Sequence, residues 1–149
     1  MSKTSVEEIL DFAIASEVSA ARFYTELAGR MESDAMRKVF EGFAEEERGH
    51  KAKLEAIKQG KVSLSAEKVV DLKIADYVVD VEPKPNMDYQ DALIWAMKSE
   101  KLAFRLYSNL AQLAEDEDLR NTLLALAQEE AKHKLRFEVE YDDVVLKEA

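Results

Sequence analysis

Apolar residues recur three and four positions apart over most of the 149-residue chain, which is the spacing of a helix with one buried face. We predict four long helices, over about 5–31, 33–60, 88–114 and 115–141. Ser5 and Glu8 form a capping box at the start of the first helix. The acidic residues of 115–118 favour the start of the fourth helix through the helix macrodipole. The buried face expected of the third helix includes Leu93, Met97, Phe104 and Tyr107.

The connections between these helices predict how they pair. Only residues 29–33 separate the first two helices, which predicts an antiparallel hairpin, and the last two are equally close. Roughly thirty residues separate the second helix from the third, a length at which a structureless loop is unusual. Within this stretch 69–79 forms either a short helix or an extended segment, and Pro83 and Pro85 stop a helix.

We therefore expect the long connection to run along the bundle as a crossover. The predicted architecture is an all-α four-helix bundle made of two antiparallel helical hairpins. It forms a single domain over 1–149, with hairpins at 5–60 and 88–145 and the crossover at 61–87.

The chain repeats itself at an offset of 83 residues. Between 17–55 and 100–138, fourteen of thirty-nine positions are identical without a gap. Generic apolar positions differ between the two halves, whereas acids and histidines on the same face are retained. This self-similarity predicts two copies of one helical hairpin. Packing alone would favour the opposite pattern, so the retained polar residues point to a function.

Four glutamates and both histidines of the chain lie on the predicted buried faces. They are Glu17, Glu47, His50, Glu100, Glu130 and His133. Each histidine follows a glutamate by three residues, so each pair presents an oxygen and a nitrogen on one side of its helix. Four carboxylates in an apolar core cost many kcal/mol unless they are neutralised, and no Lys or Arg is placed to do so. Two divalent cations balance them (−4 + 4 = 0), which predicts a two-metal site.

Each part of this pattern also has a simpler interpretation. One Glu-x-x-His on an acidic helix is as readily a solvent-exposed pair, and only the six residues together favour metal binding. Tyr24 and Tyr107 lie two turns after the lone glutamates, where each either bonds a ligand carboxylate or is a core tyrosine. Glu46 and Glu129 either accept a histidine N–H or are partly exposed acids, and we favour exposed acids.

Composition and charge exclude several classes of function. Cysteine is absent, which removes disulfides, thiol nucleophiles and iron–sulfur clusters. Thirty-one acidic and twenty-one basic residues give a net charge of −10, so we expect no nucleic-acid partner. No apolar run approaches the ~20 residues of a membrane span. The N-terminal stretch has no signal-peptide pattern, so we expect a cytoplasmic protein without a membrane partner.

Four segments carry a family resemblance, and they are 17–24 (EVSAARFY), 46–50 (EERGH), 100–107 (EKLAFRLY) and 129–133 (EEAKH). With these segments the chain resembles rubrerythrins, within the ferritin-like superfamily of di-metal carboxylate proteins. The resemblance implies a ferritin-like bundle that holds two iron ions, with manganese or zinc as substitutes, through the six residues named above. In that scheme Glu47 and Glu130 bridge the two ions.

The resemblance also implies an oxidoreductase that reduces peroxide or dioxygen, an activity associated with oxidative stress. Rubrerythrins carry a four-cysteine iron module, so a cysteine-free chain is expected to take electrons from a separate donor protein. They also carry an extra carboxylate one turn from the third-helix ligand, and positions 96, 97, 103 and 104 here hold none. A ferroxidase or iron-handling protein and a structural metal-binding bundle stay open as alternatives. We expect a homodimer.

Overall fold

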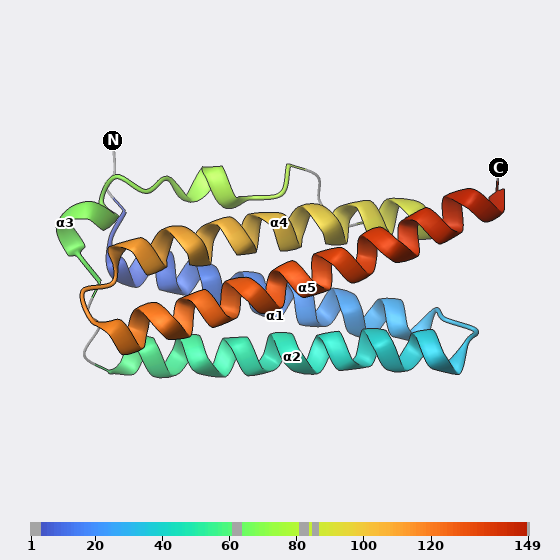
Figure 1. Cartoon of the computed structure of the whole chain (residues 1–149), viewed down its shortest axis with the longest axis horizontal. Helices are drawn as coiled ribbons and strands as arrows, with labels where there is room; N and C mark the ends of the chain where they lie inside the picture. The colour runs from blue at the N-terminus through green and yellow to red at the C-terminus, as the bar shows by residue number, and fades with distance from the viewer. Residues whose placement is uncertain (1–3, 61–63, 81–83, 85–86, 149) are drawn as a thin grey trace. The chain divides into compact units, whose positions relative to one another are not determined.

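The computed structural model describes residues 4–60, 64–80, 84 and 87–148. Its described residues form helices and one isolated β-bridge (Figure 1). The helices are α1 (Val6–Gly29), α2 (Asp34–Gln59), α3 (Ala66–Val69), the 3₁₀ helix η1 (Ile74–Tyr77), α4 (Tyr89–Leu113) and α5 (Glu117–Glu148). The four long helices are those predicted from the hydrophobic pattern. None of the described helices combines the length and apolar character that a membrane crossing requires.

Side chains cap the start of each long helix. The Oγ atoms of Ser5 and Ser33 accept from backbone N–H groups three residues on, at 3.0 and 3.3 Å. Asp88 and Asp116 do the same with Oδ1 before α4 and α5, at 2.9 and 3.1 Å. Each cap satisfies a helix N–H that lacks an intrahelical partner and contributes on the order of 1 kcal/mol. The capping prediction for Ser5 is confirmed.

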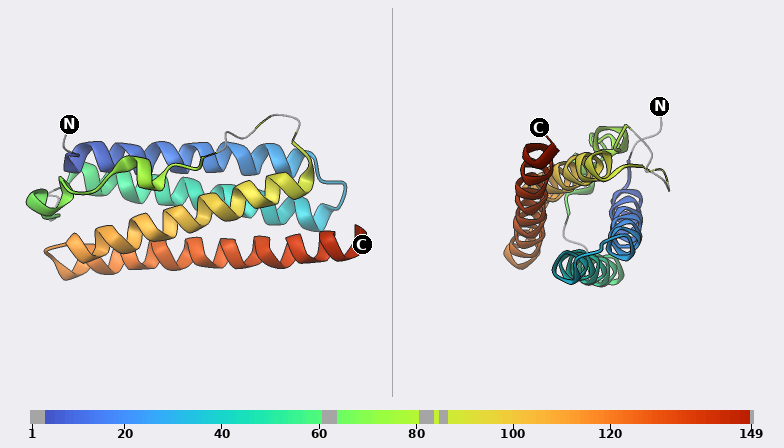
Figure 2. Two further views of the ribbon diagram at one scale, coloured as in Figure 1. Left: turned by 90° about the horizontal axis from the view of Figure 1, so that it is seen from above. Right: turned by 90° about the vertical axis from the view of Figure 1, so that its right-hand side faces the viewer.

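The chain divides into two compact units. Unit 1 comprises Met1–Val62 and Val69–Asp71, and unit 2 comprises Ser63–Lys68 and Leu72–Ala149. In unit 1, α1 and α2 pack side by side and antiparallel, and in unit 2 α4 and α5 do the same (Figures 1 and 2). Both predicted hairpins are therefore present. The assignment of 1–149 to a single domain stays a prediction.

The long connection contributes short elements to unit 2. Leu64 forms an antiparallel bridge with Ala114, and the Ser65 N–H donates to the Leu113 carbonyl at 2.9 Å. Further along, the Asn109 amide of α4 donates to the Tyr77 hydroxyl at 2.8 Å. These contacts place Leu64, Ser65 and Tyr77 of the connection against the α4 side of unit 2, as expected of a crossover. The predicted segment 69–79 is neither one helix nor extended throughout, since only 74–77 is a 3₁₀ helix. Ser63, Pro83 and Pro85 lie outside the described residues.

Two expectations from the hydrophobic pattern are wrong. The last helix does not stop near Tyr141 but continues to Glu148. No Gly or Pro occurs after 141, so nothing in the sequence terminates it. Phe104 was expected inside but is 40% exposed, because it lies at the edge of the α4 stripe beside the exposed Arg105.

A hydrogen bond between side chains joins α4 to α5 in unit 2, and it predicts that the protein loses stability at alkaline pH. The Tyr89 hydroxyl donates to Glu140 Oε1 at 2.9 Å. Burial, the hydrogen bond to Glu140 and the charge of Glu140 raise the pKa of Tyr89 above its ordinary value. The folded state thus favours the neutral phenol, and the resulting stability is present below about pH 10 and lost as the pH rises further.

We expect Tyr89→Phe to lower the free energy of unfolding at pH 8 by about 1 kcal/mol, because Glu140 loses a hydrogen-bond donor. The variant is also expected to lose less stability than the wild type between pH 9.5 and 11. Urea unfolding of both proteins at several pH values measures this. Parallel pH profiles for the two proteins would contradict the assignment.

Candidate metal centre

The first three predicted site residues lie together in unit 1. Glu17 comes from α1, and Glu47 and His50 come from α2, where their spacing of three residues puts them on one face. All three are at most 2% exposed. The apolar residues that flank them fix these helix faces inward, so the polar side chains are carried into the interior with them. We call these three residues the unit 1 cluster.

The atoms of the unit 1 cluster converge. His50 Nδ1 lies 3.6 Å from Glu17 Oε1 and 3.7 Å from Glu47 Oε1. One ligand atom from each of the three residues lies within 4.8 Å of those from the other two. An imidazole nitrogen and two carboxylate oxygens therefore face a common point.

The other three predicted residues form the same arrangement in unit 2. Glu100 comes from α4, and Glu130 and His133 come from α5. His133 Nδ1 lies 3.7 Å from Glu100 Oε1 and 3.9 Å from Glu130 Oε1, and all three residues are at most 2% exposed. We call these residues the unit 2 cluster. The internal repeat thus reproduces the geometry of the first cluster and not only its residue types.

The spacing of these atoms fits metal ligands better than hydrogen bonds. The four nitrogen–oxygen distances of 3.6 to 3.9 Å exceed the roughly 2.7–3.2 Å of an N–H···O bond. Ligand atoms about 2.0–2.2 Å from a shared ion are roughly 2.8–3.8 Å apart at bond angles of 90–120°. Three of the four distances lie in this range, and the fourth, 3.9 Å, lies just above it. Each cluster carries two carboxylates, so one divalent cation balances it (−2 + 2 = 0). The donor set of oxygen and imidazole nitrogen suits iron, manganese or zinc.

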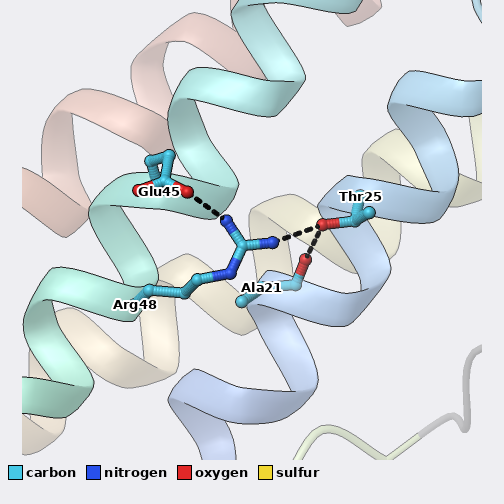
Figure 3. Close-up of polar contacts among 4 residues, drawn as sticks. All are labelled: Ala21, Thr25, Glu45 and Arg48. Atoms are coloured by element: carbon cyan, nitrogen blue, oxygen red, sulfur yellow. Dashed lines mark hydrogen bonds and ion pairs between the residues drawn. The ribbon is translucent and has the colours of Figure 1, made fainter.

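A chain of hydrogen bonds fixes α2 against α1 beside the unit 1 cluster (Figure 3). Arg48, the residue after Glu47, donates to Glu45 Oε1 at 2.7 Å and to Thr25 Oγ1 at 3.0 Å. The Thr25 hydroxyl in turn donates to the Ala21 carbonyl at 2.8 Å. Sequence reasoning did not find this contact. The spacing of three residues between Glu45 and Arg48 was a signal for their ion pair. The sequence around Arg48 gave no indication that Thr25 of α1 lies opposite it.

The remaining candidate residues are placed as follows. Tyr24 and Tyr107 are fully buried, and the Tyr24 ring packs edge-on against the Phe43 ring with centroids 6.2 Å apart. Both tyrosines are therefore core residues, and a bond from either hydroxyl to a ligand carboxylate stays a prediction. Glu46 is exposed and Glu129 is half-buried, which agrees with partly exposed acids. In the described part of the chain, the groups of side chains that could hold a metal contain the six predicted residues and no others.

Comparison with known proteins identifies the family. The family model for rubrerythrin matches residues 8–141. The chain belongs to the rubrerythrin family. No curated protein matches it. The expectation drawn from the four sequence segments is thus confirmed, and the six clustered residues all lie inside the part of the chain that matches the rubrerythrin model.

Solved structures show the fold of this rubrerythrin. A hypothetical protein from Pyrococcus furiosus is 27% identical, with a TM-score of 0.72 over 93% of this chain and 89% of its own. A candidate ferritin-like diiron-carboxylate protein from Thermotoga maritima is 20% identical, with a TM-score of 0.78 over 97% and 99% of the two chains. KatB, a manganese catalase from Anabaena, is 22% identical, with a TM-score of 0.67 over 93% and 71%. The predicted ferritin-like four-helix bundle is confirmed. Membership of the rubrerythrin family, together with the Glu/His clusters, fits a non-haem di-iron protein.

Proposed function

We propose that the unit 1 and unit 2 clusters together hold two iron ions, and that the protein reduces hydrogen peroxide or dioxygen with electrons from a separate donor protein. The observation that supports this most directly is the convergence of one imidazole nitrogen and two carboxylate oxygens in each buried cluster. Membership of the rubrerythrin family supports iron as the metal. In this proposal all six clustered residues, Glu47 and Glu130 included, would serve as ligands.

Two iron(II) ions held by these residues would each supply one electron, which with two protons balances the conversion of one hydrogen peroxide into two waters. The protein's contribution is to hold and shield the metals. Four carboxylates neutralise them, and oxygen ligands favour the higher charge of the oxidised state. Burial of all six ligands to 2% exposure or less keeps bulk water away from the site. The buried hydroxyls of Tyr24 and Tyr107 lie two helical turns from Glu17 and Glu100, where we propose that they orient these carboxylates.

Repeated turnover requires electrons from outside this chain. The protein has no cysteine, so it holds no thiolate-bound iron that could pass electrons inward. Each peroxide reduced takes two electrons, so every further turnover would require two more electrons from a reductant. A separate redox protein is the donor in this proposal.

A second candidate activity follows from the similarity to a manganese catalase fold. With manganese in the same six residues, the protein would convert two hydrogen peroxides into two waters and one dioxygen. This reaction balances without a donor, since one peroxide is oxidised while the other is reduced. The need for a reductant therefore distinguishes the two candidates.

The decisive experiment is an anaerobic titration of metal-free protein with Fe(II), followed by hydrogen peroxide. We expect two Fe(II) to bind per chain and about one peroxide to be consumed per chain without a reductant. Adding a chemical reductant should then restore consumption over many cycles. A parallel sample loaded with Mn(II) and monitored with an oxygen electrode tests the catalase reaction.

Each of the other outcomes would indicate a different function. Sustained oxygen release by the manganese sample, with an inactive iron sample, would replace the proposal with a catalase. Oxidation of many Fe(II) per chain by dioxygen, together with a large closed assembly, would indicate iron handling. Stoichiometric metal that never reacts with peroxide or dioxygen would indicate a structural site.

A further inference from the structure

One face of α5 exposes large apolar side chains. Leu124, Leu135, Val139 and Leu146 are 42, 62, 46 and 73% exposed. At 100° per residue these four positions fall within about 60° of one another. They lie on the opposite side of α5 from its buried residues, which include Leu123, Leu126 and Phe137. With the exposed Ala131 on the same face, we call these five residues the α5 stripe.

The internal repeat supplies a comparison within the same molecule. The residues of α2 that match Leu124, Ala131 and Leu135 at the 83-residue offset are Glu41, Arg48 and Ala52, and all three are exposed. The same face of the same kind of hairpin is therefore charged or small in unit 1 and apolar in unit 2. Because the hairpin does not require apolar residues there, the α5 stripe is a property of α5 itself. Large apolar side chains that gather on one exposed face mark a candidate site of association.

The order of residues along the α5 stripe is symmetric about Leu135. Leu124 and Leu146 lie eleven residues before and after it, and Ala131 and Val139 lie four residues before and after it. Exposed polar residues, Gln128 and Asp142, fill the same face at seven residues on either side. A sequence with this symmetry is complementary to itself when reversed. Such a face suits an isologous interface, in which a twofold axis pairs each residue with its symmetric counterpart in the other copy.

We propose that a second copy of this chain covers the α5 stripe, with the two α5 helices antiparallel and the twofold axis passing beside Leu135. In this register Leu124 of one copy lies level with Leu146 of the other, and the Gln128 amide lies level with the Asp142 carboxylate, to which it can donate.

The charges beside the stripe are compatible with this register. Lys134 and Glu138 lie on the same flank of the stripe and form an ion pair within the chain at 2.7 Å. In the antiparallel arrangement Lys134 of each copy is brought near Glu138 of the other, so four alternating charges meet. A parallel arrangement would place the like residues opposite one another.

The size of the stripe sets the expected strength of the dimer. From residue 124 to 146 the helix is about 33 Å long at 1.5 Å per residue. A single helix face of this length lies at the small end of specific interfaces, and both copies carry a charge of −10. We therefore expect a dissociation constant in roughly the micromolar range at physiological salt, and tighter association as salt screens the repulsion.

The absence of cysteine allows a direct test on the full chain. We expect Leu135→Cys to form a disulfide-linked dimer on mild oxidation, because the twofold axis brings the two new thiols within the roughly 4.4–6.8 Å Cα spacing of a disulfide. The matched control is Ala52→Cys, the equivalent exposed position on α2, which should stay a free thiol. Leu124→Cys alone should not cross-link, whereas Leu124→Cys combined with Leu146→Cys should.

Sedimentation velocity over a range of concentrations tests the unmodified protein. The wild type should show a monomer–dimer equilibrium, and Leu135→Lys should shift it at least tenfold towards monomer with an unchanged circular dichroism spectrum. A wild type that stays monomeric at several hundred micromolar would overturn the proposal, whatever else covers the stripe. Cross-linking of Leu124→Cys alone, or of Ala52→Cys as readily as Leu135→Cys, would also overturn it.

Discussion

Replacing Glu47 with glutamine is expected to weaken metal binding at the proposed centre severely. Glutamine keeps the shape of the side chain but removes the charge, so the unit 1 cluster falls from two carboxylates to one. The affinity for Fe(II) should fall at least about 100-fold, since loss of a residue that only supports a ligand already costs 10- to 100-fold. Isothermal titration or equilibrium dialysis under anaerobic conditions measures this, and peroxide consumption should disappear with the metal.

The neighbouring residue provides the control. Glu46 differs from Glu47 by one position and is exposed. Glu46→Gln should therefore bind two Fe(II) with unchanged affinity and react with peroxide at the wild-type rate. Wild-type stoichiometry and affinity in Glu47→Gln would show that the unit 1 cluster is not a metal site. The same pair of variants exists in unit 2, where Glu130→Gln and Glu129→Gln test the second cluster independently.

In metal-free protein the same substitution should not lower stability. Buried carboxylates cost free energy when no cation balances them, so Glu47→Gln is expected to keep or raise the melting temperature of metal-free protein. The wild type gains stability from bound metal, because the ion binds only the folded state, and the variant should lose this gain. Opposite effects with and without metal separate a ligand from a residue that merely supports packing.

The sequence predicted the parts of this structure that depend on local chemistry. The helices follow from apolar spacing, and their starts follow from side chains such as Ser5 and Asp88 that bond nearby N–H groups. Glu47 and His50 were placed on one face by their spacing alone. Glu17 required a further step, because it lies on another helix, and the internal repeat supplied that step by retaining Glu100 at the matching position.

Features that depend on contacts between elements were not predicted. The Thr25 hydroxyl meets Arg48 only because α1 and α2 pack in a particular register. Phe104 satisfies the spacing of a buried residue, but its position at the edge of the stripe decides its exposure. The crossover was recognised by its length, whereas its attachment through Tyr77 to Asn109 depends on tertiary packing. Spacing assigns a residue to a helix face but does not show what covers that face.

Replacing Phe40 with alanine is expected to cause a large loss of stability. Phe40 is fully buried, and its ring packs edge-on against the Phe43 ring with the two centroids 6.4 Å apart. The Phe43 ring in turn packs edge-on against the Tyr24 ring, with centroids 6.2 Å apart. Alanine removes the ring and leaves a cavity in the interior of unit 1, at a cost of about 3–5 kcal/mol. For a chain of this length that corresponds to a fall in melting temperature of about 10–15 °C.

Two further variants show whether this loss comes from the cavity. The repeat places Leu123 at the position equivalent to Phe40, and Leu123 is also fully buried, so Phe40→Leu should cost only about 1–2 kcal/mol. Phe104→Ala removes the same ring from a partly exposed site and should cost about 1 kcal/mol or less. Urea unfolding of the metal-free proteins, followed by circular dichroism, gives all three values without a contribution from metal binding. Equal losses in Phe40→Ala and Phe104→Ala would mean that burial does not set the cost, and the assignment of Phe40 to the core of unit 1 would be wrong.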